Sequence, residues 1–296
     1  MNEFTYYNSY FSLNNNEKIY LDISDLNLYK IPILTNNNIY FIDIKNNKIV
    51  HINNEVNNMK NLISMDCSGN NIKNINWIQP YIKNLNCSSN YLKNIPLNCY
   101  SLKNLNCKNN EISDIPIEIK NFIYLENLDI SYNKINTISK NMCDLSNLIS
   151  LNLSNNNITK LFDFKKLINL RELNLYNNKI KKIPNSLFNC EKLHYLNIGL
   201  NNINQISNDI NKLKKLYELL LFGNNINKIP KITIKLKELD ICGCCFIEKI
   251  KYINSLIMLN ISGTKIKKLP NKIFKNKIIK KIIIKNNKLN KINLII

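Results

Sequence analysis

Apolar residues recur along this chain in one short pattern that repeats from about residue 19 onward. One copy runs from Leu170 to Pro184, in which Leu173 and Leu175 alternate as in a strand and later apolar residues follow at turn-like intervals. A strand and a turn cannot bury an apolar face alone, so each copy needs neighbours stacked on both sides. The pattern therefore predicts an elongated array of coils and not a closed globular core.

The central apolar residue of each strand marks thirteen copies, at steps of 20 to 23 residues. These residues are Leu21, Ile42, Met65, Leu85, Leu105, Leu128, Leu151, Leu173, Leu196, Leu219, Leu239, Leu259 and Ile282. A period of this length indicates a solenoid in which neighbouring repeats share one continuous core. We predict one repeat domain over residues 19–296, with residues 1–18 as a segment that caps the first coil. Disorder of that segment is the competing interpretation.

An asparagine follows most of the strands at the point where the chain turns. Ten coils have it, as Asn47, Asn70, Asn90, Asn110, Asn133, Asn156, Asn178, Asn201, Asn224 and Asn287. The amide carries both donors and an acceptor, so stacked copies can satisfy backbone groups that the turn leaves unpaired. The other three coils have Leu26, Cys244 and Thr264. On the opposite side we expect short helices, 3₁₀ turns or extended segments, with more room in 23-residue than in 20-residue coils.

The copy from Leu170 to Pro184 has the spacing LxxLxLxxNxLxxI, at Leu170, Leu173, Leu175, Asn178, Ile180 and Ile183. The spacing resembles the leucine-rich repeat family and covers nearly the whole chain. The resemblance implies an α/β repeat solenoid, a horseshoe or arc of about thirteen coils with a parallel β-sheet on its concave face. The mixture of 20-, 22- and 23-residue coils with Ile-Pro steps resembles the intracellular branches of the family. That likeness implies an adaptor role in signalling or phosphatase regulation.

Sequence motifs for catalysis or cofactor binding are nearly absent. The two histidines, His51 and His194, lie in no metal-binding or nucleophile motif. No two glycines are closer than twenty residues, so the chain has no glycine-rich phosphate loop. A catalytic set that could support an enzyme is not found. We therefore expect a non-enzymatic protein without a cofactor or a bound metal.

The nine cysteines are an odd number without the spacing of a disulfide framework, and the N-terminus lacks the features of a secretory signal. We therefore expect a cytoplasmic, reduced protein, and a nuclear location is also compatible. One group, Cys242, Cys244 and Cys245, resembles a metal site but lacks a fourth ligand. A second group at twenty-residue spacing is predicted to form a buried column, namely Cys67, Cys87 and Cys107.

The formal charge of +20 suggests a nucleic-acid or anionic-membrane partner. However, Arg171 is the only arginine among 41 basic residues, and the chain has 62 asparagines, which together favour coding bias as the origin of the charge. The excess lies entirely in residues 149–296, with 28 basic and 8 acidic residues. We expect an outer ridge at Lys160, Lys181, Lys182, Lys212, Lys214, Lys215, Lys228, Lys249, Lys267, Lys268, Lys272, Lys275, Lys277 and Lys280.

Strand alternation predicts which side chains line the concave face. The residue after each central position is acidic, asparagine or apolar, and never lysine. Eight of the 21 acidic residues lie directly before or after a central position, where Lys281 is the only base. A nucleic-acid binder that used this face would need basic residues there. The sequence thus favours a protein partner that presents a basic or aromatic segment, and makes binding of nucleic acid or anionic lipid the alternative.

The predicted binding surface lies on coils eight to eleven, where aromatic side chains stand beside acids as in many interaction hot spots. It comprises Glu172, Tyr176, Tyr195, Asn197, Glu218, Leu220, Phe222, Glu238 and Asp240. A weaker second candidate comprises Tyr20, Asp22, Phe41, Asp43 and Asp66. No capping segment follows the last repeat, so self-association through the C-terminal end is a further hypothesis.

Overall fold

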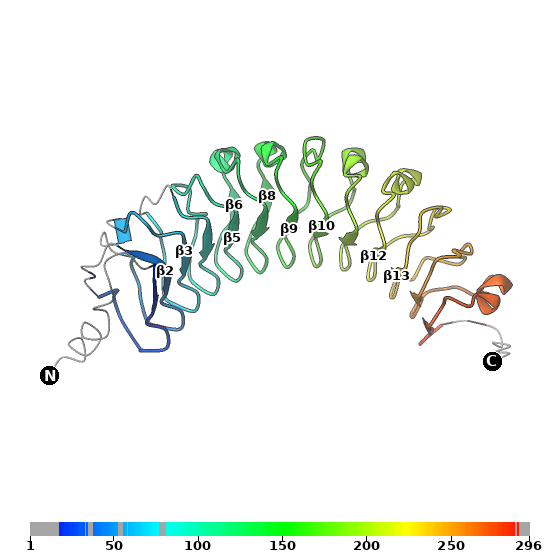
Figure 1. Cartoon of the computed structure of the whole chain (residues 1–296). Coiled ribbons are helices and arrows are strands. Elements are labelled where there is room, and N and C mark those ends of the chain that lie inside the picture. The colour runs from blue at the N-terminus through cyan, green and yellow to red at the C-terminus, as the bar shows by residue number, and fades with distance from the viewer. Residues whose placement is uncertain are drawn as a thin grey trace.

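The computed structural model describes residues 18–32, 34, 38–52, 56–57, 59–76, 81–287 and 289. These residues form a single arc in which the strands line the inner side and turns line the outer side (Figure 1). Of the predicted cap only Lys18 is described, and residues 290–296 of the C-terminal end lie outside the described residues. No helix among the described residues has both the length and the apolar character needed to cross a bilayer.

Thirteen short strands form one parallel sheet in chain order, as predicted. They are β1 (Ile19–Asp22), β2 (Ile39–Asp43), β3 (Ser64–Asp66), β4 (Asn84–Asn86), β5 (Asn104–Asn106), β7 (Asn127–Asp129), β9 (Ser150–Asn152), β10 (Glu172–Asn174), β11 (Tyr195–Asn197), β12 (Glu218–Leu220), β13 (Glu238–Asp240), β14 (Met258–Asn260) and β15 (Lys281–Ile283). Each central residue pairs with that of the next strand, as Leu196 does with Leu219. The register read from the sequence is therefore confirmed.

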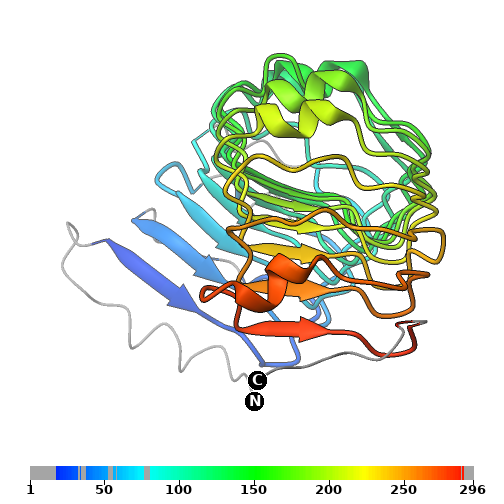
Figure 2. The same cartoon turned by 90° about the vertical axis from the view of Figure 1, so that its right-hand side faces the viewer.

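The outer side carries 3₁₀ helices of five residues, opposite the sheet (Figure 2). They are η2 (Ile117–Asn121), η3 (Lys140–Asp144), η4 (Asn185–Asn189), η5 (Asn208–Lys212) and η6 (Asn271–Lys275). All five lie in 23-residue coils, because the extra residues supply the length of the helical turn. The strands β6 (Asp114–Ile115) and β8 (Thr137–Ile138) pair separately from the main sheet. The described helical segments are thus 3₁₀ and not α.

The asparagine ladder forms between neighbouring coils. Asn133 accepts from the Ile112 backbone N–H at 2.9 Å and donates to the Cys107 and Ile130 carbonyls at 3.0 and 3.2 Å. Where asparagine is missing, the Cys244 thiol lies 3.3 Å from the Leu221 carbonyl. These bonds satisfy buried backbone groups at the turn, which explains why the position is so restricted.

The residue before each ladder position has a left-handed backbone, with φ between 48° and 69° in all thirteen coils. Glycine, asparagine, aspartate and serine hold this position in most coils, and all but serine tolerate the conformation comparatively well. Tyr132 and Leu200 are the exceptions. Leu200 has φ 48° and a side chain that is 41% exposed, so burial does not account for its presence there.

Candidate binding surface on the concave face

The column of residues that follows the central position of each strand has a structural role. Asp129 Oδ1, for example, accepts the Ser131 backbone N–H at 2.9 Å, and Asn174 accepts that of Tyr176 at 3.1 Å. The same bond is made by Asp22, Asp43, Asp66, Asn86, Asn106, Asp129, Asn152, Asn174, Asn197, Asp240 and Asn260. These side chains close the turn after the strand. The acids of this column are therefore explained first by the fold and not by a ligand.

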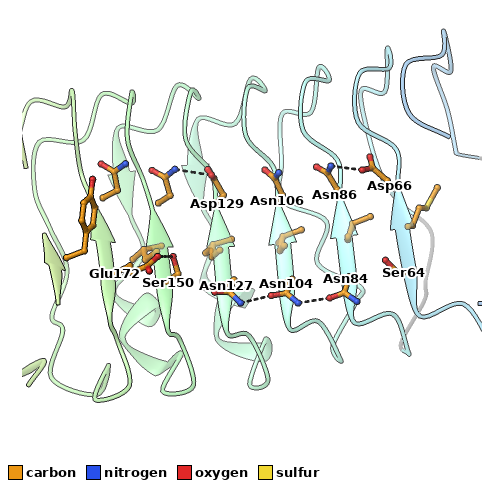
Figure 3. Close-up of a pocket in the computed structure, with 18 residues that line it drawn as sticks. Ser64, Asp66, Asn84, Asn86, Asn104, Asn106, Asn127, Asp129, Ser150 and Glu172 are labelled. Carbon is orange, nitrogen blue, oxygen red and sulfur yellow. Dashed lines mark hydrogen bonds between the residues drawn. The ribbon is translucent and has the colours of Figure 1, made fainter. Parts of the chain in front are cut away.

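In coils three to seven the polar side chains of the concave face bond to one another. We call this surface the polar lattice, and it comprises Ser64, Asp66, Asn84, Asn86, Asn104, Asn106, Asn127, Asp129, Ser150 and Asn152. Asn127 donates to Asn104 at 2.6 Å, and Asn104 donates to Asn84 at 2.5 Å (Figure 3). In the second row Asn86 donates to Asp66 at 2.8 Å. The lattice borders a shallow hollow of about 430 Å³.

Coils eight to eleven carry a different set of side chains on the same sheet. We call this surface the aromatic patch, and it comprises Glu172, Tyr176, Tyr195, Glu218, Leu220, Phe222, Glu238 and Asp240. The pairing of the four adjacent strands β10 to β13 brings these residues together. The Tyr176 and Phe222 rings contact across coil nine, with centroids 5.6 Å apart. Leu220 and Phe222 are both partly exposed and not packed in the core.

Asn197 also belongs to the predicted set, but its side chain is only 8% exposed. Its Oδ1 accepts the Gly199 backbone N–H at 3.0 Å, and its Nδ2 donates to the Tyr195 hydroxyl at 3.2 Å. Both ends of the amide are therefore engaged within the protein. The structure corrects the prediction that Asn197 faces a partner, because the residue closes its own turn and orients Tyr195.

Leu220 departs from the rule of its column. The only other apolar residue in the column is Ile283, which lies on the last strand. An Asp or Asn at 220 would accept the backbone N–H of residue 222, as the equivalent side chain does in eleven coils. A leucine side chain cannot make this bond. Coil ten thus has an apolar side chain on the concave surface in place of a structural hydrogen bond.

Two glycines, which sequence reasoning did not assign to the surface, shape the patch. A Cβ on Gly199 would lie 2.5 Å from Cε1 of Phe222, and a Cβ on Gly223 would lie 2.3 Å from Cδ2 of Leu200. Phe222 of coil ten therefore occupies the space that Gly199 leaves in coil nine, and Leu200 of coil nine occupies the space at Gly223. The one sequence signal for this arrangement was Leu200, a leucine at a position that most coils fill with Gly, Asn, Asp or Ser.

The acids of the patch lack internal counterions. The ion pairs among the described residues join Lys45 to Asp43, Lys103 to Glu126, Lys134 to Glu111, Lys166 to Asp144 and Lys212 to Asp209. Burial, and then the Glu238 carboxylate, hold the pKa of Glu218 above its ordinary value. Burial, and then Asp240, raise the pKa of Glu238, while Lys281 opposes the shift. The pair thus places negative charge, without an ion-pair partner among the described residues, beside an apolar surface.

The second candidate surface is smaller. Tyr20 and Phe41 have ring centroids 6.2 Å apart, and Tyr20 is 59% exposed. Asp43, however, pairs with Lys45 at 2.9 Å, and Asp22 bonds to the Ser24 hydroxyl at 2.7 Å. The acids are thus engaged within the protein.

The histidine and cysteine candidates have ordinary structural environments. His194 Nδ1 lies 2.6 Å from the Arg171 carbonyl, and its ring packs edge-on against Tyr217. The described residues contain no group of three or more His, Cys, Asp or Glu placed to hold a metal ion. Burial raises the pKa of Cys190 to about 12 and that of Cys244 to about 11. The predicted column is confirmed as buried, at Cys67, Cys87 and Cys107.

The lysines of the predicted outer ridge are all exposed. Only Lys212 of that set takes part in an ion pair among the described residues, with Asp209 at 3.0 Å. Lys212 lies in η5, and Lys272 and Lys275 lie in η6, on the side opposite the sheet, so these lysines can be tested separately from the patch.

Comparison with protein families gives two matches. A model described as leucine-rich repeats in two copies matches residues 146–187, and a model described as a leucine-rich repeat matches residues 168–226. No curated protein sequence matches the chain significantly.

Solved structures resemble the whole arc. A leucine-rich repeat protein of Leptospira interrogans has a TM-score of 0.79 at 24% identity, covering 91% of this chain and 79% of that one. The functional domain of InlJ from Listeria monocytogenes, which includes a cysteine ladder, has a TM-score of 0.81 at 23% identity, covering 90% and 58%. The ectodomain of the receptor kinase GASSHO1/SCHENGEN3 from Arabidopsis thaliana was solved in complex with CASPARIAN STRIP INTEGRITY FACTOR 2. It has a TM-score of 0.71 at 22% identity, and the match covers 87% of this chain and 34% of that one. The chain thus spans less than two thirds of the latter two proteins.

Proposed function

Since the chain is a leucine-rich repeat protein, we propose that it is a non-enzymatic scaffold that binds a protein partner through the aromatic patch. Proteins with this repeat generally serve as interaction scaffolds. The receptor kinase ectodomain of similar fold is in complex with another protein, which supports a protein as the partner. An adaptor role in cytoplasmic signalling or phosphatase regulation is the finer form of the proposal, and the partner would present a basic or aromatic segment.

Leu220 is the single observation that carries this proposal. At its position the fold favours Asp or Asn, which close the turn in eleven other coils. Natural sequences follow such local requirements except where function demands otherwise. An apolar side chain there, next to the Tyr176 and Phe222 ring contact of 5.6 Å, forms an anchor of the kind that dominates protein interfaces.

The direct test is a capture experiment from source cells with two variants of the full chain. Replacing Tyr195, Leu220 and Phe222 together with alanine is expected to abolish capture of the partner, while circular dichroism shows an intact fold. The matched control replaces three lattice residues of the same sheet face, Asn84, Asn104 and Asn127, and is expected to retain the partner. Retention of the partner by the patch variant would refute this assignment.

The alternative is binding of nucleic acid or anionic membrane through the exposed lysine ridge. It predicts retention on heparin that collapses between low and moderate salt, because counterion release dominates such binding. The concave patch offers no basis for that behaviour, since its charged residues are acids. Capture that survives moderate salt but fails in the patch variant favours the scaffold.

A further inference from the structure

The aromatic patch contains an apolar floor made of Tyr176, Leu220 and Phe222. The centroids of the two rings are 5.6 Å apart across Gly199, and Leu220, the last residue of β12, lies two residues before Phe222. In the other interior coils the positions equivalent to Leu220 carry polar side chains bonded to their own turns. The floor is thus a local apolar area next to the polar lattice of coils three to seven.

The floor is held in place by its backbone surroundings. Phe222 lies over Gly199 and Leu200 lies over Gly223. Each of these two side chains thus fills the space above a glycine of the neighbouring coil. Side chains confined in this way lose little further freedom when a partner docks, which favours binding. Leu200 has the left-handed backbone that all thirteen coils share at this position, with φ 48°, and its side chain is 41% exposed. The surface is therefore shaped before a ligand arrives.

The charge beside the floor is unbalanced. Glu218 lies two residues before Leu220 on β12, and its register partner on β13 is Glu238. Like charges directly opposite each other weaken a sheet. Neither glutamate is in any of the ion pairs found among the described residues, although lysine supplies all but one of the 41 basic residues. A cation supplied from outside would complement both carboxylates.

The spacing between charge and floor matches an extended peptide. In an extended chain, residues i and i+2 face the same side at a separation of about 6.8 Å. Glu218 and Leu220 have this relation on β12, and a partner segment lying along β12 would present its own side chains at the same interval. We propose that the patch binds an extended protein segment with a cationic and an apolar side chain two residues apart. The cation lies between Glu218 and Glu238, and the apolar group rests on the floor.

This inference rests on the proposed function and specifies the chemistry of the partner. The probe is the peptide acetyl-Gly-Leu-Ser-Lys-Ser-Leu-Gly-amide, which offers an apolar group two residues from the cation in either chain direction. Its binding to the full chain is followed by ligand-observed NMR at low salt. Glutamine in place of lysine is expected to weaken binding at least tenfold, and serine in place of both leucines likewise. Arginine in place of lysine is expected to retain binding, because a guanidinium also pairs with carboxylates.

The protein variants locate the contacts. Glu218→Gln with Glu238→Gln is expected to remove the difference between the lysine and glutamine peptides. Its control, Glu111→Gln with Glu126→Gln, removes two acids that already pair with lysines and is expected to bind as the natural chain does. Equal binding of the lysine and glutamine peptides to the natural chain, or no binding at millimolar peptide, would overturn the inference.

A further variant tests the floor. Gly199→Ala places a methyl group against Phe222 without a left-handed backbone requirement, so it displaces the ring while the coil can remain folded. Gly199→Ala is expected to weaken binding of the lysine peptide about tenfold. Ser88→Ala, at the equivalent position of coil four, is expected to leave the affinity unchanged. If the lysine peptide binds Gly199→Ala and the natural chain with the same affinity, the floor does not contact the peptide.

The same variants separate this inference from the proposed function. If the triple alanine variant loses the cellular partner and the double glutamine variant keeps it, the cation contact is wrong and the patch remains. If the triple variant keeps the partner, the proposed function itself is wrong.

Discussion

Coils three to seven and coils eight to eleven share one backbone and differ in what their concave side chains do. In the polar lattice, Asn104 bonds to Asn84 and Asn127 and so completes an arrangement within the protein. In the aromatic patch, Leu220 makes no such bond and Glu218 has no ion-pair partner among the described residues. The difference shows that the candidates for contact with a partner are the concave side chains that make no hydrogen bond or ion pair within the protein. An acidic or polar concave surface alone is not a sign of a ligand.

The largest effect is expected from giving coil ten the side chain that other coils have. Leu220→Asn removes an apolar anchor, so affinity for the protein partner should fall by about 2 kcal/mol, the size typical of a hot spot. Stability should stay equal or rise, because asparagine can accept the residue 222 N–H. Calorimetry of binding and thermal unfolding measure the two quantities. Unchanged affinity would show that the two regions do not differ in function.

The opposite exchange in the lattice should affect stability alone. Asn86 accepts from the Ser88 N–H at 3.2 Å and hydroxyl at 2.8 Å and donates to Asp66 at 2.8 Å. Asn86→Leu is expected to lower the free energy of unfolding by about 1–2 kcal/mol, because these groups lose partners. Denaturant titration measures the loss, and partner capture should be unchanged. A variant as stable as the natural chain would remove the structural role assigned to the lattice.

Binding of the cationic peptide should depend on pH in the patch. The pKa values of Glu218 and Glu238 are raised by burial and by neighbouring acids, so these carboxylates gain protons at a higher pH than exposed glutamates do. The groups facing them are Tyr195 on β11, Asp240 on β13 and Lys281 on β15. Affinity should therefore fall about tenfold as pH decreases from 7 through the raised pKa values of the pair. NMR titrations from pH 7 to 4 test this, and the double glutamine variant should give a flat profile.

The smallest effect concerns stability. A carboxyl whose pKa is raised by folding favours the folded state when protonated, and this contribution is lost as pH rises through the folded pKa. Glu218→Gln with Glu238→Gln removes the cost of charging the two raised-pKa carboxyls in the folded state, so at pH 7 it should raise the free energy of unfolding by about 0.5 kcal/mol, since partly exposed charges interact weakly. The gain should shrink as the pH falls through the raised pKa values of the pair. A loss of stability at pH 7 would mean that the pair serves the fold.

Much of this molecule follows from period and alternation. The central positions, such as Leu173 and Leu196, could be placed because a period of 20 to 23 residues permits only one stacking register. The outward direction of Leu220 follows from the same register, since side chains alternate along a strand. The ladder asparagines, such as Asn133, could be assigned because the turn recurs with unpaired backbone groups. These predictions depend only on neighbours in one coil or the next.

Other features of the site could not be predicted in this way. Strand alternation places aspartates such as Asp129 on an acidic concave face, while their hydrogen bonds to the turn depend on the folded backbone. Asn197 was expected to be accessible, but its environment depends on how the Tyr195 side chain lies above it. The contact of Phe222 with Gly199 could not be predicted, because it depends on the distance between two neighbouring coils.

The amino-acid sequence by itself determined the number of coils, the parallel sheet and the face to which each strand residue points, because these depend on repeating intervals along the chain. Only the tertiary structure decided which of those exposed side chains are already engaged and which remain open to a partner. The physical reason is that a hydrogen bond, an ion pair or a ring seated over a glycine depends on distances between coils. Such distances are set by stacking and leave no periodic mark in the sequence.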